Sequence, residues 1–165
     1  MKSYPLTSRL ASGFTLLELM VVIIIIGILA TMAIPSFYIK NVRDQIGTIT
    51  NLLSVAQAPV AASWSITQTM PANNAVAGIP AADKMVSNVV SSVQIVNGAI
   101  DITFSARAMP PLRGKVLTYR PAVVPGEPMV PIVWLCGNAS APPKMAAQGV
   151  NATNIDPNYL PNNCK

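Results

Sequence analysis

A long apolar run dominates the N-terminal part of the chain. Between Phe14 and Ile34 the sequence contains a single ionisable residue, Glu18. About 20 apolar residues in a helix are enough to cross the hydrocarbon of a bilayer. The run therefore predicts a membrane-spanning helix over residues 14–35. Residues 1–13 carry two cations and no acid, which predicts a leader that stays cytoplasmic.

After Pro35 the apolar positions recur at steps of three and four, which is the pattern of one buried helix stripe. The stripe consists of Ile39, Val42, Ile46, Ile49, Leu53, Ala56 and Val60. Together with the apolar run it predicts one helix from about Phe14 to Ala58, about 65 Å long at 1.5 Å per residue. Gly27 and Pro35 are weak points that would make this helix flexible, and Pro59 is expected to bend or end it.

The remainder of the chain predicts an antiparallel sheet. Gln68–Ala82 has the composition of a surface loop, and four short segments rich in β-branched residues follow it. They are Val89–Val96, Ala99–Ala106, Lys115–Val123 and Met129–Leu135. Asn97-Gly98 predicts a tight hairpin. Pro121 and Pro131 cannot donate to a sheet, so we expect their strands to be edge strands or to contain breaks.

These elements predict an α+β fold in which a long N-terminal helix packs on an antiparallel sheet of about four strands. At 165 residues the chain is long enough for one domain, over residues 36–165, in addition to the apolar helix. The sequence contains no His and two Cys, and it contains no glycine-rich phosphate loop or paired-carboxylate motif. We therefore expect no enzymatic activity, no cofactor and no metal site.

Glu18 is unusual because an acid within an apolar run is unfavourable and generally has a function. The alternative is a plain anchor whose Glu18 lies among the lipid headgroups. Gly13-Phe14-Thr15-Leu16-Leu17-Glu18 resembles the N-terminal signature of type IV pilins, in which a basic leader ending in Gly precedes an apolar run. The junction precedes the run, so cleavage would keep the apolar helix, whereas removal of a secretory signal would not.

This resemblance implies cleavage between Gly13 and Phe14 by a prepilin peptidase that also methylates Phe14. It implies residence in the inner membrane of a Gram-negative bacterium, then addition by the assembly machinery to an extracellular fibre of identical subunits. Within that family, Glu18 would meet the Phe14 amine of a neighbouring subunit. Minor pilins and type II secretion pseudopilins share this signature.

Cys136 and Cys164 are the two cysteines. In an exported chain such a pair favours a disulfide, and the alternative is two unpaired buried thiols. The segments from Arg120, Val133 and Asn158 resemble the C-terminal half of major type IVa pilins, where a disulfide-closed loop follows the last strand. The resemblance thus implies a 136–164 disulfide loop, and it argues against a pseudopilin.

Four cations lie in a stretch without acids, between Asp101 and Glu127. They are Arg107, Arg113, Lys115 and Arg120. If a loop joins the strands here, they could form a patch that attracts nucleic acid phosphates. A solvated face, or pairing with acids of neighbouring subunits, is the simpler interpretation. The resemblance implies a major pilin whose fibre serves adhesion, twitching motility and DNA uptake, and a DNA-binding minor pilin is the alternative.

Overall fold

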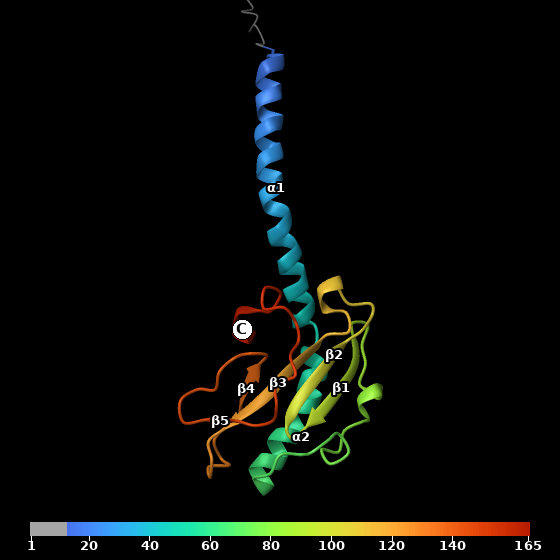
Figure 1. Ribbon diagram of the computed structural model, residues 1–165, viewed down its shortest axis with the longest axis vertical. Coiled ribbons are helices and arrows are strands. Elements are labelled where there is room, and N and C mark those ends of the chain that lie inside the picture. Colours follow the sequence, from blue (N-terminus) through green and yellow to red (C-terminus); the bar gives the residue numbers. More distant parts are fainter. Residues whose placement is uncertain (1–12) are drawn as a thin grey trace, which may run out of the picture. The chain divides into compact units, whose positions relative to one another are not determined.

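The structure is a computed structural model that describes residues 13–165, apart from the side chains of residues 32–35. The chain divides into two compact units, one ending at Tyr38 and the other formed by Ile39–Lys165. Figure 1 shows the order of the elements along the chain. The predicted leader lies outside the described residues, except for Gly13.

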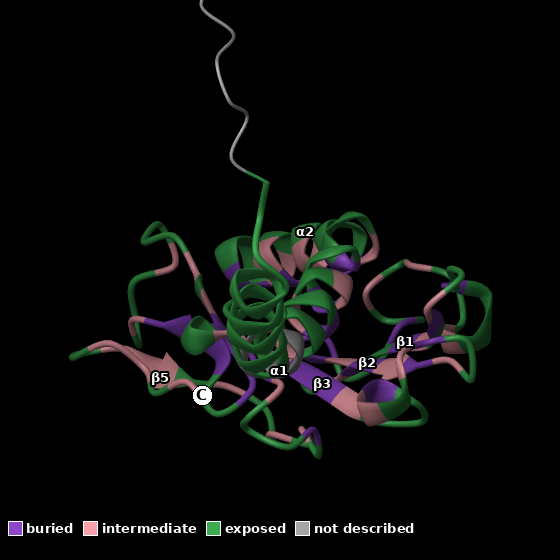
Figure 2. Cartoon of the chain, turned by 90° about the horizontal axis from the view of Figure 1, so that it is seen from above, coloured by how far each residue is buried: buried purple, intermediate pink, exposed green. Residues whose placement is uncertain are grey.

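Helix α1 extends over Leu16–Gly47. The Thr15 hydroxyl oxygen accepts a hydrogen bond from the Glu18 backbone N–H at 3.2 Å, which caps the first turn. Up to Thr31 every described residue of α1 is exposed, so Figure 2 shows this part of the helix in green. The helix is long and apolar enough to cross a membrane.

The prediction of one helix that ends near Pro59 is wrong in two respects: the described part of this region forms two helices, and the second continues past Pro59. Helix α1 ends at Gly47, and α2 extends over Thr50–Thr67. At the break, the backbone N–H groups of Thr48 and Ile49 donate to carbonyls three residues earlier, which tightens the chain. Gly and Thr are poor helix formers, which is why the helix breaks here. Pro59 lies inside α2, because packing of the buried stripe holds the helix together across it.

The predicted apolar stripe is confirmed. Six of its seven members are buried, Ile39 is half-buried, and Trp64 continues the stripe to the end of α2. The stripe packs against side chains of the sheet to form the hydrophobic core. The fully buried members on the sheet side include Val93, Ile102, Phe104 and Leu117. The break between α1 and α2 does not interrupt this core, because Ile49 lies within it.

The predicted antiparallel sheet is also confirmed. Its main strands have the order β1-β2-β3-β4, and a short β5 pairs with β3. The bounds are β1 Val90–Val96, β2 Ala99–Phe104, β3 Val116–Val123, β4 Val133–Cys136 and β5 Ala146–Ala147. Three 3-10 turns, η1 Ala82–Lys84, η2 Pro110–Leu112 and η3 Asn162–Cys164, lie in the connections. The fold is therefore α+β as expected, and β5 was not predicted.

The hairpin at Asn97-Gly98 is confirmed. Both residues have positive φ, 49° and 85°, as a tight primed turn requires. A Cβ on Gly98 would lie 2.8 Å from Met70, so the side chain of this nearby residue also requires glycine here. The turn brings β1 and β2 into register as far as the Val96–Ala99 pair.

Pro121 and Pro131 were expected in edge strands or in strands with breaks, and the structure differs from the first of these expectations. Pro121 lies in the central strand β3, opposite Trp134 of β4, so an edge position is wrong for it. However, the pairing of β3 with β2 ends at Tyr119, so the strand changes partners just before this proline. The Pro121 carbonyl accepts from the Gln148 N–H at 2.8 Å instead. Pro131 precedes β4, which begins four residues later than predicted.

The outer edge of β1 is covered by one buried side chain. Asn74, in the loop after α2, donates to the Val93 carbonyl at 2.9 Å and accepts from the Ile95 N–H. It also donates to the Pro80 carbonyl. The amide thus imitates a neighbouring strand and satisfies backbone groups that an edge strand would leave open.

Candidate assembly and surface sites

Gly13, Phe14 and Glu18 lie together at the start of α1. Gly13 precedes the helix, and Phe14 is 75% exposed. Thr15 and Glu18 have the spacing of a capping box, a signal that the sequence analysis did not use. A carboxylate in the first turn also interacts favourably with the helix dipole. Glu18 therefore has a local stabilising role at the helix start, and its exposed carboxylate remains available to a second partner.

The apolar surface of α1 is extensive and uncovered by the described part of the chain. Leu16 is 77% exposed, and the following Leu, Val and Ile residues up to Leu29 are also exposed. A surface of this kind requires lipid or another protein to cover it. Helix α1 is continuous across Gly27 and Pro35, the two positions expected to make it flexible. The space around the Gly27 Cα is open.

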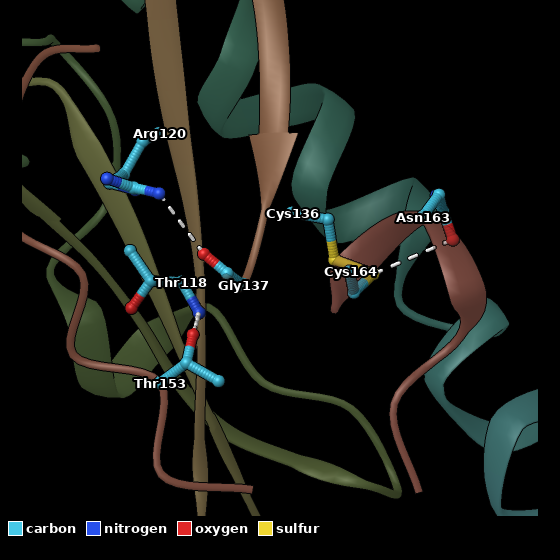
Figure 3. The surroundings of a disulfide bond; sticks show 7 residues. All are labelled: Thr118, Arg120, Cys136, Gly137, Thr153, Asn163 and Cys164. Carbon is cyan, nitrogen blue, oxygen red and sulfur yellow. Dashed lines mark hydrogen bonds between the residues drawn. A yellow bond between two sulfur atoms is a disulfide. The ribbon is translucent and has the colours of Figure 1, made fainter. Parts of the chain in front are cut away.

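The disulfide between Cys136 and Cys164 is present, with the two Cα atoms 4.5 Å apart. It joins the end of β4 to the C-terminal turn η3 (Figure 3). Beside it, the Gly137 N–H donates to the Thr118 carbonyl at 2.8 Å, and the Asn138 N–H donates to the Cys164 carbonyl. The last residues are therefore fixed to the sheet by covalent and backbone bonds together.

Thr118 connects the sheet to the loop closed by the disulfide. Its N–H donates to the Thr153 hydroxyl at 3.0 Å, as Figure 3 shows. Its hydroxyl donates to the Asp101 carboxylate at 2.6 Å and accepts from the Ala152 N–H. Burial raises the pKa of Asp101, and the hydrogen bond from Thr118 lowers it by less. This network holds residues 151–153 against β3.

Three of the four predicted basic residues lie together, and the fourth does not join them. Arg107, Arg113 and Lys115 are exposed in the connection between β2 and β3. None of the three lies within ion-pair distance of a carboxylate in the described part of the chain. Arg120 is half-buried, and its guanidinium donates to the Gly137 carbonyl, as Figure 3 shows, and also to the Ala139 carbonyl. We therefore remove Arg120 from the exposed patch.

A groove that the sequence analysis missed lies between the end of α2 and the segment before β4. It has a volume of about 290 Å³ and is lined by Ala61, Ala62, Trp64 and Ser65 and by residues 128–132. The signal for it was Trp64, which follows Val60 by four residues and so had to lie on the same helix face. Residues 13–165 contain no group of His, Cys, Asp or Glu side chains that could hold a metal ion.

Comparison with known proteins gives two family matches. Residues 8–34 match the prokaryotic N-terminal methylation motif, and residues 42–165 match the pilin family of bacterial filaments. The chain is 32% identical to the fimbrial protein EcpC of Eikenella corrodens, over 95% of this chain and 92% of that protein. It is 31% identical to the type IV major pilin protein PilE1 of Neisseria gonorrhoeae, over 96% and 89%. Identity to the type IV major fimbrial protein FimA of Dichelobacter nodosus is 25%, over 94% and 97%.

Proposed function

This chain belongs to the pilin family of bacterial filament subunits, and we propose that it is the major subunit of a type IV pilus. Membership makes it a structural subunit of fimbriae, and the methylation motif implies processing by a prepilin peptidase. The observation that carries the proposal is that one chain combines an exposed apolar helix segment in α1 with a complete α+β core. Relatives named as major pilins match nearly the whole chain, which supports a major role.

The domain organisation follows from this function. Residues 1–13 would be the leader, residues 14–35 the membrane and assembly helix, and residues 36–165 the globular domain. Before assembly, lipid would cover the apolar side chains of α1. In the fibre, the same side chains would pack against neighbouring helices. Gly27 and Pro35 would allow the helix to adjust when it moves from one environment to the other.

Glu18 would direct each new subunit into register. In a dry environment an unpaired charge is costly and an opposite charge attracts it strongly. The free amine of a processed Phe14 on a neighbouring subunit supplies such a charge. The apolar side chains from Leu16 onwards supply most of the contact area but little direction, because burial of apolar surface is non-directional.

Substitution Glu18→Ala tests this role. We expect the precursor to be made, inserted and cleaved after Gly13, while electron microscopy of the cells shows few or no fibres. Thr15→Ala serves as the matched control, because it removes the cap at the helix start but keeps the carboxylate. Normal fibre yield from Glu18→Ala cells would contradict the register role. Fibre loss in cells that lack the protein altogether would support a major subunit.

We propose adhesion and twitching motility as the uses of the fibre, by analogy with the family. DNA uptake, as the role of a DNA-binding minor pilin, is a second candidate. It is favoured by three exposed cations, Arg107, Arg113 and Lys115, that have no carboxylate nearby in the described chain. Retained fibres with lost DNA uptake in the deletion strain would favour this second candidate.

A further inference from the structure

The connection between β2 and β3 forms a fixed and projecting turn. We call residues 105–115 the basic turn. Ala108 and Leu112 are buried in the core, and the Met109 N–H donates to the Gln45 side chain of α1 at 2.7 Å. The Leu112 N–H closes the 3-10 turn by donating to the Met109 carbonyl. These contacts fix the backbone of the basic turn. A partner that bound the turn would therefore cause little loss of conformational entropy.

The outward side of the basic turn combines cations with a rigid apolar group. Arg107, Arg113 and Lys115 are exposed, and Pro110 is exposed between them in η2. The Arg113 Nε donates to the Ala108 carbonyl at 2.9 Å, which fixes the base of that side chain. A complementary surface would need an apolar depression with a carboxylate at its rim.

The groove beside Trp64 supplies the apolar depression, and an acid adjoins its lining residues in the sequence. Its walls are mostly apolar, and Met129 on its rim is 87% exposed. Trp64 is buried, and its indole N–H has no hydrogen-bond partner in the described chain. Glu127 directly precedes the lining residue Pro128 and is exposed. Its carboxylate has no ion pair or hydrogen bond within residues 13–165.

The two surfaces lie at opposite ends of the same strand. The basic turn leads into Val116, the first residue of β3, whereas Glu127 and the groove follow Val123, its last residue. Eight residues of strand cover about 26 Å at 3.3 Å per residue. Figure 1 shows the η2 turn and the segment after β3 at the two ends of the sheet. A contact between opposite ends of identical molecules is heterologous, so it repeats and does not close on two copies.

We infer that the basic turn of one copy docks onto the Trp64 groove of a second copy, with Pro110 in the groove and Arg107 facing Glu127. This inference rests on the proposed fibre function and adds a contact between globular domains to the contact between helices. A nucleic acid would satisfy the cations but leave the apolar groove and Met129 uncovered. A second copy satisfies both surfaces through one contact, with Pro110 against the apolar walls of the groove and the pair of Arg107 and Glu127 beside it.

Cysteine cross-linking in assembled fibres tests the contact directly. The double variant Pro110→Cys with Met129→Cys places one thiol on each surface. After mild oxidation of sheared fibres, we expect a ladder of covalent oligomers on a non-reducing gel. The single variants should give no oligomer larger than a dimer. The pair Pro110→Cys with Val150→Cys, which uses another exposed apolar residue, should give no ladder. Fibres of normal yield without a ladder would overturn the inference and leave the fibre function intact.

A charge exchange covers the case in which the cysteine variants form no fibres. Arg107→Glu and Glu127→Arg should each lower fibre yield at least fivefold, and the combination should restore at least half of it. Lys144→Glu changes an exposed cation outside both surfaces, so it should leave the yield unchanged. Wild-type yield from both single variants, or no restoration by the combination, would overturn the contact. A third outcome would also overturn the contact: the Arg107→Glu variant gives a normal yield of fibres, but these fibres no longer bind duplex DNA at low salt.

Discussion

At the scale of single residues, Asp101 is the one acid in the described strands, and it is half-buried. Its carboxylate accepts a hydrogen bond from Thr118, yet burial raises its pKa above the usual 3.8. The folded protein therefore holds a proton at Asp101 more tightly than the unfolded chain does. The contribution of Asp101 to the free energy of unfolding should be greatest below pH 3.8 and should fall as the pH rises through the higher pKa of the folded state.

Asp101→Asn should remove this step, because asparagine keeps an acceptor for Thr118 but does not titrate. Urea unfolding of the detergent-solubilised protein at a series of pH values would measure it. The matched control is Asp83→Asn, which changes an exposed carboxylate and the net charge equally. An unchanged pH profile in Asp101→Asn would show that burial at this site does not influence stability.

Asn74 illustrates how much one buried amide contributes to the sheet edge. Asn74→Ala would leave the Ile95 N–H and two carbonyls without their partners. Each unsatisfied buried group costs about 1–3 kcal/mol, so we expect a loss of roughly 2–4 kcal/mol in unfolding free energy after partial relaxation. The urea midpoint would report it. Asn73→Ala is the control, since Asn73 is exposed and makes one local hydrogen bond, from Val76. Equal losses in the two variants would contradict the role of Asn74.

At the scale of elements, the disulfide closes the segment between β4 and η3. Cys164→Ser should lower the free energy of unfolding by roughly 2–5 kcal/mol, because the open loop has more freedom when unfolded. We expect less protein in the membrane as a result. Thr153→Ala offers a comparison, because it removes one hydrogen bond from the same loop and leaves the disulfide intact. If Cys164→Ser were no less stable than Thr153→Ala, the loop would depend on its hydrogen bonds alone.

The elements also show which features of the fold could be predicted. The stripe from Val42 to Val60 was predictable because burial on one helix face imposes a fixed period on the sequence. The hairpin was predictable because Asn97-Gly98 suits a turn with positive φ. The helix break at Thr48 was not, because its signal is a weak local preference within a continuous stripe. The continuation of α2 through Pro59 could not be predicted either, because tertiary packing outweighs the hydrogen bond that the proline removes.

The candidate sites divide in the same way. The disulfide could be predicted because the chain has two cysteines and resembles exported subunits, whereas the roles of Phe14 and Glu18 stay predictions. The groove depends on two segments far apart in sequence, Ala61–Ser65 and residues 128–132, which only the fold brings together. The half-buried position of Arg120 could not be predicted either, because the carbonyls that it binds belong to the turn after β4, which is distant in the sequence.

At the scale of the whole molecule, the methylation motif implies processing by a prepilin peptidase, and the predicted position of cleavage can be tested. Mass spectrometry of the exported protein should find an N-terminus at Phe14 that is heavier by one methyl group. Gly13→Trp should keep the precursor in the membrane with its leader attached, because a bulky residue then occupies the cleavage position. Ser3→Trp, within the leader and away from the junction, is the control. A mature start after Ala30 would contradict both the cleavage position and the retained helix.

The cover that Asn74 places over β1 has a consequence for storage of the subunits. A protein that waits in a membrane at high density is exposed to its own copies before the machinery uses them. An open strand edge would let those copies join backbone to backbone, as amyloid does. Because the Val93 carbonyl and the Ile95 N–H of β1 are already bound by Asn74, we expect this edge to be a poor template for such growth. We therefore expect the subunits to polymerise through the exposed apolar side chains of α1 and not through strand edges of the sheet.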